Sequence, residues 1–317
     1  MKQRVLIPQQ IAQAGIDFLL RQGYEVRMGS DYSEATIARE VKDCDAILVR
    51  ATPVTEQVLE NANRLKIIAR FGVGYDNVDL SAAAKRKIYV TNTPLANSNA
   101  VAEYTIFLLL ACAKRHSELQ PVFLAGDFQV RDRIFCNELR GKTLGIIGLG
   151  NIGCLVATMA KTAFGMKVIA YDPYLSEDNK LACVDAVLPR EAVFAEADYV
   201  SIHVPSTPKT KGSVGSVEFA LMQPHAWLIN TARGDIVVEE DLIAAIESKQ
   251  IAGAALDVLE KEPFNYNNPL FTFPNVMITP HYAAHTVEAF DAMALHAAEE
   301  IDRVLRGQKP FWQVNRF

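Results

Sequence analysis

The stretch LGIIGLGNIGCLVATMAKTAFGMKVIAYD, residues 144–172, is the most informative part of this sequence. An apolar run typical of a strand enters a glycine-rich turn, and a helical pattern and a second apolar run follow before Asp172. The glycines of the turn are Gly148, Gly150 and Gly153. This is the G-x-G-x-x-G pattern between a strand and a helix, with an acid about 20 residues further on. The stretch therefore predicts a βαβ unit that binds a dinucleotide.

The three glycines have different expected roles. Gly148 permits the tight turn, Gly150 lets the backbone approach a pyrophosphate, and Gly153 lets the helix pack closely against the sheet. The helix N-terminus offers N–H groups and the positive end of its dipole to the phosphates. A carboxylate at Asp172 would accept hydrogen bonds from the ribose hydroxyls and repel a 2′-phosphate, and the next two residues add no basic group. We therefore expect NAD rather than NADP.

The composition is that of a globular protein. The chain has 317 residues, enough for two domains, and its net charge of -5 argues against nucleic acid as a partner. The five cysteines are widely spaced, without a CxxC pair or a Cys/His cluster suited to a metal, which favours free thiols in a reducing compartment. The longest apolar stretch, 105–113, is about half a membrane span, so we expect no membrane partner and a cytoplasmic location.

Short apolar runs alternate with helical patterns along the whole chain. We expect strands at residues 5–7, 46–49, 66–69, 89–91, 144–147, 168–171, 199–203, 227–230, 253–256 and 276–278. The helical patterns outside the fingerprint cover residues 11–22, 33–42, 55–61, 80–86, 99–116 and 285–306. This alternation predicts an α/β protein with parallel sheets that carry helices on both faces. The helix at 99–116 is apolar almost all round and should be buried, and the last helix should pack back on the first unit.

Charged and titratable residues follow three successive predicted strands. Arg233 comes after the strand that ends at residue 230, Asp257 and Glu262 after the next, and His281 after the last. Sites in open α/β sheets form beyond the carboxyl ends of the strands, so these side chains should meet at one edge.

Each of these residue types suits the oxidation of a 2-hydroxy acid. An arginine holds a carboxylate or polarises a carbonyl oxygen, and a histidine takes the hydroxyl proton and returns it in the reverse direction. Glu262 would stabilise and orient the imidazolium of His281. His285 lies four residues on and competes for the histidine role, whereas His203 is expected near the adenine end or in a structural role. Asp257 either hydrogen-bonds the cofactor or caps a turn.

Taken together, the motifs resemble those of the D-2-hydroxyacid dehydrogenase family, in order and spacing, over nearly the whole chain. The matching segments are RFGVGYDNVDL (70–80), GKTLGIIGLGNIG (141–153), HVPSTPKT (203–210), LINTARGDIV (228–237), AALDVLEKEP (254–263) and ITPHYAAHT (278–286). Among the subgroups, the chain looks most like the short phosphoglycerate dehydrogenases that lack a regulatory domain.

The resemblance implies two Rossmann/flavodoxin-like domains with parallel sheets. An NAD-binding domain, residues 98–283, would be inserted into a substrate domain formed by 1–97 and 284–317. The family is typically dimeric, which implies a homodimer with the region that begins near Asn99 at the interface. Because the chain ends at Phe317, no serine-responsive regulatory domain is expected.

The resemblance also implies roles for individual residues. The catalytic set would be Arg233, Glu262 and His281. The residues that match cofactor-contacting positions are Gly148, Gly150, Asn151, Ile152, Gly153, Asp172, Val204, Thr231, Ala232 and Asp257. Val73 and Gly74 match the backbone loop that cradles the substrate carboxylate. Arg50 and Arg70 match basic positions near the substrate phosphate.

The expected function is an NAD-dependent interconversion of a D-2-hydroxy acid and its 2-keto acid, with 3-phosphoglycerate and phosphohydroxypyruvate, in serine biosynthesis, as the first choice. Reduction of hydroxypyruvate, glyoxylate or another 2-keto acid is the alternative. An NAD-sensing protein like the C-terminal-binding corepressors is a third interpretation. Formate dehydrogenases resemble the chain less because they pair the histidine with glutamine. The chain departs from the family at three positions. Asn151 stands where many relatives have a basic residue, and Ala284 stands where a glycine is frequent. Tyr282 replaces a smaller aliphatic residue and is expected to narrow the pocket.

Overall fold

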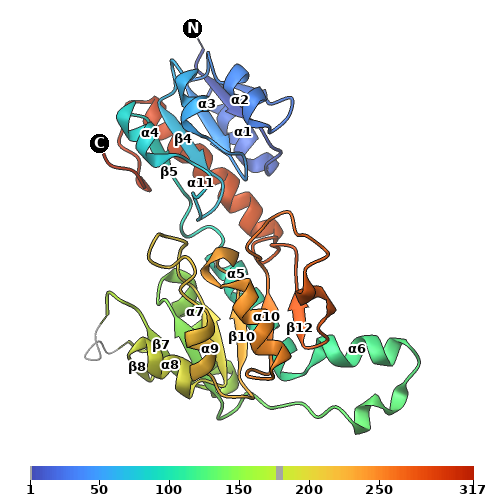
Figure 1. Ribbon diagram of the computed structural model, residues 1–317. Helices are drawn as coiled ribbons and strands as arrows, with labels where there is room; N and C mark the ends of the chain where they lie inside the picture. The colour runs from blue at the N-terminus through green and yellow to red at the C-terminus, as the bar shows by residue number, and fades with distance from the viewer. Residues whose placement is uncertain (1, 176–180) are drawn as a thin grey trace. The chain divides into compact units, whose positions relative to one another are not determined.

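A computed structural model describes residues 2–175 and 181–317 of the chain. The chain divides into two compact units (Figure 1). The first unit consists of residues 1–97 and 285–317, and the second of residues 98–284. The second unit thus interrupts the first in sequence, and it runs one residue further than the boundary expected from the resemblance. Each unit is built around its own parallel sheet.

The sheet of the first unit has five strands in the order β2-β1-β3-β4-β5. Their bounds are β1 Arg4–Ile7, β2 Glu25–Met28, β3 Ala46–Val49, β4 Ile67–Arg70 and β5 Tyr89–Thr91. All neighbouring pairs are parallel. The sequence did not predict β2, because this edge strand is largely exposed and lacks the apolar run of a buried strand.

Helices cover both faces of this sheet. On one face lie α2 (Glu34–Glu40), α3 (Glu56–Glu60) and α4 (Leu80–Lys85), whose apolar residues share a buried cluster with alternate strand residues. On the other, α1 (Gln13–Arg21) packs against α11 (Val287–Leu305), which also contacts β3 and β4. The prediction that the last helix packs back on the first unit is therefore confirmed.

The sheet of the second unit has seven strands in the order β12-β11-β10-β9-β6-β7-β8. Their bounds are β6 Thr143–Ile147, β7 Lys167–Tyr171, β8 Ala186–Val187, β9 Tyr199–Ile202, β10 Trp227–Asn230, β11 Gly253–Leu256 and β12 Val276–Ile278. Every pair in this sheet is parallel too. The predicted α/β class with two parallel sheets is confirmed.

Two apolar layers bury the two faces of this second sheet. The helices of one layer are α5 (Ser98–Ala113) and α7 (Asn151–Phe164), and those of the other are α8 (Arg190–Glu196), α9 (Ser216–Leu221) and α10 (Glu239–Glu247). Successive strand residues alternate between the layers, as Ile146 and Ile147 do. Burial on both faces explains why these strands are continuous apolar runs in the sequence.

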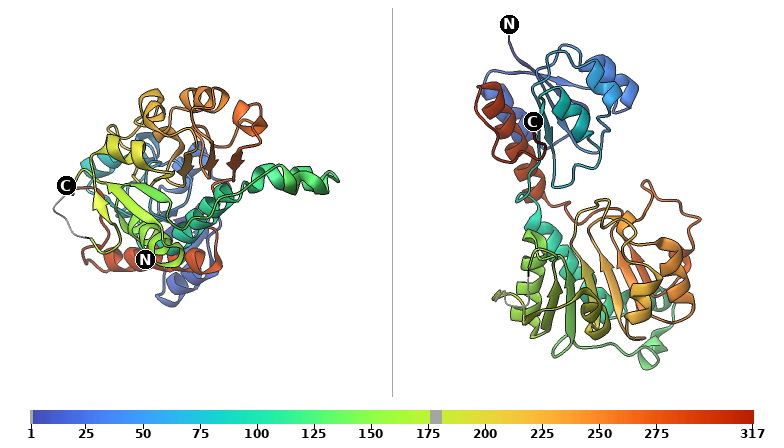
Figure 2. Two further views of the ribbon diagram at one scale, coloured as in Figure 1. Left: turned by 90° about the horizontal axis from the view of Figure 1, so that it is seen from below. Right: turned by 60° about the vertical axis from the view of Figure 1, so that its left-hand side comes forward.

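The helix predicted at 99–116 is shorter than expected. Arg115 adopts a left-handed backbone with φ of 47°, which ends α5 and starts α6 (His116–Leu124). With the following turn η1 (Phe128–Asp132), α6 forms an arm that extends away from the sheet of the second unit (Figure 2). No residue of α6 is buried. Within the part of the chain that the structure describes, no helix has the length and apolar character needed to cross a bilayer.

Candidate active site

The carboxyl ends of the parallel strands β6, β9, β10, β11 and β12 lie at one edge of the second sheet. The loops that leave these five ends carry the glycine turn and the three residues for which the sequence predicts chemistry. The short turns η2 (Gly234–Ile236) and η3 (Pro269–Thr272) belong to the connections between the same strands.

The glycine turn after β6 packs without room for side chains. Gly148 has φ of 100°, and a Cβ there would lie 2.9 Å from the carbonyl oxygen of His203 and 2.8 Å from a methyl carbon of Val204. A Cβ on Gly153 would overlap the carbonyl oxygen of Gly148. In contrast, nothing lies within 4 Å of a Cβ built on Gly150. Two glycines thus serve close packing, and the third leaves open space beside the backbone.

The groups around Gly150 fit a dinucleotide. Gly150 is the N-cap of α7 and no side chain caps this N-terminus, which presents the positive end of the helix dipole. The Asp172 carboxylate at the end of β7 accepts hydrogen bonds from the backbone N–H groups of Leu149 and Tyr174, both at 2.9 Å. These contacts fix the carboxylate next to the glycine turn, where a ribose would have to lie.

The loop that carries Arg233 is braced by Asn230, a residue that sequence reasoning missed. The Asn230 side chain accepts a 3.0 Å hydrogen bond from the Ala232 N–H and donates a 2.9 Å one to the Arg233 carbonyl. The Arg233 guanidinium donates to the Ala232 carbonyl at 2.7 Å. The Thr231 hydroxyl pairs with that of Thr105 on α5 at 2.9 Å. Asn230 is the polar last residue of the otherwise apolar strand β10, and this sequence feature could have indicated its role.

His281 and Glu262 form a pair. The Nδ1 atom of His281 lies 2.8 Å from a carboxylate oxygen of Glu262, and both side chains are partly exposed. The backbone N–H of His281 donates to the Asp257 carbonyl at 2.8 Å, and His281 has φ of 53°. Because Nδ1 faces Glu262, Nε2 is the ring nitrogen directed away from the carboxylate.

Asp257 holds the loop that contains His281. Its carboxylate is fully buried and accepts hydrogen bonds from the Thr279 hydroxyl (2.6 Å) and from the N–H groups of Tyr282 (2.7 Å) and Ala283 (2.9 Å). Burial raises the pKa of Asp257, and these hydrogen bonds oppose the shift. The Thr279 hydroxyl is also in contact with that of Tyr104. This arrangement favours a positioning role for Asp257 over contact with the cofactor.

Two other histidines differ from His281 in their surroundings. Burial lowers the pKa of His203 to about 4, so its ring is neutral at pH 7, and it lies 2.8 Å from the Ser201 hydroxyl. A neutral buried ring suits the structural role that the sequence allowed. His285 belongs to the first unit, where its ring centroid lies 4.9 Å from that of Phe290.

In the first unit, Arg50 follows β3 as a half-buried cation. Its guanidinium carbon lies 5.5 Å from the ring centroid of Phe71 and 5.1 Å from that of Phe290, and it donates to the Gln10 carbonyl at 3.1 Å. Burial lowers the pKa of Arg50. Among residues 2–175 and 181–317, no carboxylate forms an ion pair with Arg50, which suits the binding of an external anion.

Arg70 ends the neighbouring strand β4 and is held by the loop that follows. Its Nε donates to the Asn77 side chain at 3.2 Å, and its guanidinium also contacts the Phe71 carbonyl. The Asn92 side chain donates to the Val73 carbonyl at 2.8 Å. These contacts fix the backbone before Gly74. Because Arg50 follows β3, and Arg70 and the predicted carboxylate loop come at the end of β4, all of them lie at the carboxyl edge of the first sheet.

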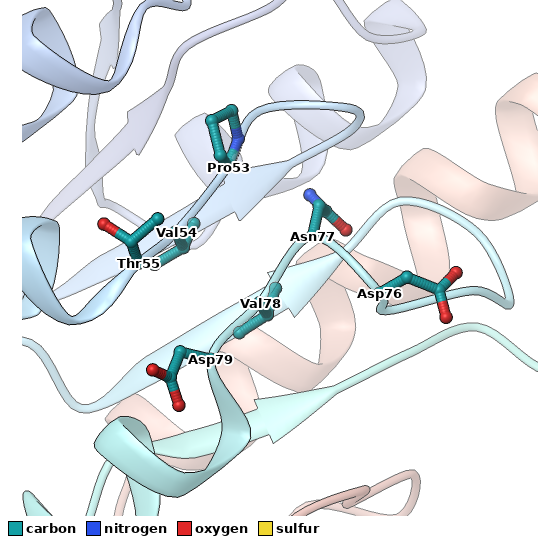
Figure 3. A pocket seen from close by; sticks show the side chains of 7 residues that line it. All are labelled: Pro53, Val54, Thr55, Asp76, Asn77, Val78 and Asp79. Carbon is teal, nitrogen blue, oxygen red and sulfur yellow. The ribbon is translucent and has the colours of Figure 1, made fainter. Parts of the chain in front are cut away.

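A surface depression of about 290 Å³ lies between two loops of the first unit (Figure 3). Its lining residues are Pro53, Val54, Thr55, Asp76, Asn77, Val78 and Asp79. Asp79 caps α4 by accepting a 2.8 Å hydrogen bond from Ala82 N–H. Because two acids line this depression, it is unsuited to an anionic substrate.

A family model of known proteins matches most of the second unit. The family model described as "D-isomer specific 2-hydroxyacid dehydrogenase, NAD binding domain" matches residues 106–283. The chain belongs to this family. The match covers the glycine turn, Asp172 and the loops that carry Arg233, Glu262 and His281. The predicted membership in the D-2-hydroxyacid dehydrogenase family is thus confirmed, whereas the phosphoglycerate dehydrogenase subgroup is not resolved.

This family member is similar to enzymes with two different substrates. It is 40% identical over 307 residues to a D-3-phosphoglycerate dehydrogenase of Synechocystis sp., an alignment that covers 96% of this chain and 54% of that protein. It is 39% identical over 330 residues to a glyoxylate reductase of Thermococcus litoralis, covering 100% of this chain and 98% of that one. The chain spans about half the length of the curated phosphoglycerate dehydrogenases that it matches.

A solved structure with a similar fold was determined with NADP bound. The NADPH-dependent glyoxylate/hydroxypyruvate reductase of Sinorhizobium meliloti, solved with NADP and malonate, matches with a TM-score of 0.87 and 30% identity. That match covers 99% of this chain and 97% of the other. The family model and this structure support a nicotinamide dinucleotide as the ligand of the family. They do not distinguish NAD from NADP for this chain.

Proposed function

We propose that this family member is an NAD-dependent oxidoreductase that interconverts a D-2-hydroxy acid and its 2-keto acid. The observation that carries the proposal is the His281–Glu262 pair, 2.8 Å apart, beyond the same sheet edge as the glycine turn. A histidine fixed by a carboxylate is suited to proton transfer, and the glycine turn is suited to the dinucleotide.

In this proposal each of the three residues has one role. His281 Nε2 gives a proton to the carbonyl oxygen of the keto acid, or takes it from the hydroxyl group in the oxidative direction. Glu262 stabilises the imidazolium and fixes its orientation through Nδ1. Arg233 binds the substrate by charge-assisted hydrogen bonds that polarise its carbonyl group. The bound nicotinamide supplies or accepts the hydride.

We assign the NAD site to the glycine turn and the neighbouring loops. The residues proposed to hold it are Gly148, Gly150, Asn151, Ile152, Gly153, Asp172, Val204, Thr231 and Ala232. The fixed carboxylate of Asp172 supports NAD, because it would face a ribose and repel the 2′-phosphate of NADP. Asp257, which the resemblance placed among the cofactor contacts, is proposed to act through the loop of His281.

For the substrate we propose 3-phosphoglycerate and phosphohydroxypyruvate. Arg50 supports this choice because a half-buried guanidinium that forms no ion pair with a carboxylate of the described residues favours a dianion such as a phosphate group. Arg70 is proposed to assist it, with the backbone of Val73 and Gly74 on the substrate carboxylate. Glyoxylate or hydroxypyruvate reduction is the second candidate, because the glyoxylate reductase of Thermococcus litoralis matches over the full length of both chains.

The experiment that tests the function measures oxidation of NADH and of NADPH with phosphohydroxypyruvate, hydroxypyruvate, glyoxylate, pyruvate and a branched 2-keto acid. Preference for NADH with the phosphorylated acid is the expected result. Preference for an unphosphorylated acid would keep the mechanism and replace the substrate. Tight NADH binding with no turnover of any acid would refute the enzymatic proposal.

Arg50→Gln separates the two substrate candidates. Loss of a charge-assisted contact should lower kcat/KM for phosphohydroxypyruvate by about 10- to 100-fold. The value for glyoxylate, which has no phosphate, should change little and serves as the control. An equal loss for both acids would mean that Arg50 supports the fold of its loop rather than the phosphate.

We also propose a homodimer in the cytoplasm. The arm of α6 and η1, and the residues that follow it as far as Phe135, carry large apolar side chains that a monomer would leave in water, with Phe135 76% and Leu124 72% exposed. A second copy of the chain is the proposed partner. All five cysteines are free, which supports a reducing compartment.

A further inference from the structure

The glycine turn is in contact with a thiol. Cys154 lies in the first turn of α7, and its Sγ is 3.3 Å from the carbonyl oxygen of Leu149, to which it donates. The N–H of Leu149 donates to the Asp172 carboxylate at 2.9 Å. Residue 149 is therefore held on both sides, by the carboxylate through its N–H and by the thiol through its carbonyl. Any reaction at the Cys154 sulfur removes one of these two contacts.

A second thiol lies beside the first. The segment 181–185 lies along α7, where the Lys161 ammonium contacts the Val184 carbonyl (3.3 Å) and the Asp185 carboxylate (2.8 Å). Lys161 and Cys154 are seven residues apart, about two helical turns, and so lie on one face of α7. Cys183 precedes Val184 in this segment, and its thiol is close enough to that of Cys154 to raise the pKa of Cys154.

The surroundings of the two thiols are those of a partly exposed pair. Both side chains pack against the apolar layer between α7 and the sheet, and both are partly exposed, whereas Cys112 in the same layer is buried. The groups that face the Cys154 thiol are Cys183 and the Asp172 carboxylate. Burial, followed by these two neighbours, raises the pKa of Cys154 to about 11, so it is protonated at pH 7.

We propose that Cys154 and Cys183 are an oxidative modification site, at which hydrogen peroxide joins the two sulfurs in a disulfide next to the glycine turn. The Cys183 thiolate attacks the peroxide, breaks its O–O bond and becomes a sulfenic acid, with hydroxide as the leaving group. The Cys154 sulfur then displaces the sulfenic oxygen, which leaves as water with the thiol proton. Two thiols are oxidised and one peroxide is reduced to water and hydroxide, which is neutralised by the proton of the first thiol.

The disulfide has a consequence for the cofactor. A disulfide sulfur has no hydrogen to donate, so the Leu149 carbonyl loses its contact with Cys154. Residue 149 then keeps only the contact of its N–H with Asp172, while the Gly148 N–H still donates to the Tyr171 carbonyl at 2.8 Å. Provided that this turn binds the dinucleotide, as proposed above, the affinity for NADH should fall by about three- to tenfold, which corresponds to the loss of one hydrogen bond.

The test uses the full chain, reduced and then treated with hydrogen peroxide. Free thiols are blocked with an alkylating agent, cross-linked peptides are mapped by mass spectrometry, and the Kd for NADH is measured by fluorescence before and after treatment. Dithiothreitol is added to reverse the oxidation. Cys183→Ser removes the proposed attacking thiol, and Cys136→Ser, at an exposed cysteine elsewhere, is the matched control.

The expected result is a Cys154–Cys183 linkage in the wild type and in Cys136→Ser, with weaker NADH binding that dithiothreitol restores. Cys183→Ser should show neither change. The proposal is overturned if peroxide produces no such linkage, if Cys183→Ser loses NADH affinity to the same extent, or if the linkage leaves the Kd unchanged. If the reduced protein does not bind NADH, the cofactor proposal fails, and peptide mapping still decides separately whether the two thiols react.

Discussion

At the residue scale, His281 is fixed by contacts of three kinds. Glu262 holds the ring through Nδ1, the Asp257 carbonyl holds the backbone N–H, and the Asp257 carboxylate holds the two residues that follow. The backbone of His281 is in the left-handed region, which these contacts stabilise. A side chain held in this way needs little reorganisation before proton transfer, which is the condition for efficient acid–base catalysis.

His281→Ala tests the role of this residue. Loss of a positioned general acid should lower kcat by about a hundredfold to ten-thousandfold, while the Kd for NADH stays nearly unchanged because the glycine turn is intact. Steady-state kinetics and fluorescence titration of NADH measure the two effects. His285→Ala is the comparison variant. A small loss in His281→Ala together with a large loss in His285→Ala would transfer the proton-transfer role to His285.

At the element scale, the loops after β10 and β11 pack against each other at Gly234, with no room for a side chain. A Cβ on Gly234 would overlap the backbone of Leu259 and Glu260. Gly234 follows Arg233, and the contacted backbone leads to Glu262, so the close approach of the two loops sets where both proposed catalytic side chains lie. The glycine here is required by packing, since its φ is outside the left-handed region.

Gly234→Ala should therefore disturb stability and catalysis together. The extra methyl group forces the two loops apart, which is expected to cost about 1–3 kcal/mol in the free energy of unfolding. The kcat should fall as well, because Arg233 and Glu262 move relative to His281. Urea denaturation and steady-state kinetics measure the two effects. Gly150→Ala, at a position with open space for a Cβ, should leave stability nearly unchanged, and equal destabilisation by both would contradict the packing argument.

The arm of α6 and η1 is the element for which a partner is expected. Phe128 and Phe135 are 62% and 76% exposed. Replacement of both by serine should convert the proposed dimer to a monomer, because it removes the apolar surface that the second copy would cover. Sedimentation equilibrium measures the mass. A wild-type protein that is monomeric at high concentration would contradict the proposed homodimer, and a dimeric variant would place the interface elsewhere.

At the scale of the whole molecule, the buried ring of His203 links stability to pH. The pKa of His203 is about 4 in the folded chain and 6.5 for a histidine exposed to water, as in the unfolded chain. The unfolded state therefore binds more protons between these two pH values. The free energy of unfolding should therefore fall as the pH falls from 6.5 towards 4, by up to about 3 kcal/mol from this residue.

His203→Gln provides the check on this prediction, because it removes the titrating group. Urea denaturation at several pH values should show a stability difference between wild type and variant that decreases from pH 7 to pH 4. A pH-independent difference for His203→Gln would mean that folding does not change the pKa of His203, which would contradict the prediction.

The sequence by itself determined most of the fold and the candidates for chemistry. Continuous apolar strands and glycine punctuation reflect local and periodic constraints, because both faces of a parallel sheet must be buried and a tight turn needs glycine. This is why the βαβ unit, the two sheets and the loop positions of Arg233, Glu262 and His281 followed from the pattern. The edge strand β2 did not, since exposure on its surfaces removes the apolar signal.

Only the tertiary structure decided how these residues are held. The brace of Asn230, the burial of Asp257 behind the His281 loop and the overlap that Gly234 avoids all join segments distant in sequence. The same is true of the Cys154 and Cys183 thiols, which are 29 residues apart in the chain and are neighbours beside α7. Such contacts depend on strand order and helix packing, which a periodic pattern does not encode, because it records which face a side chain occupies and not which neighbour it meets.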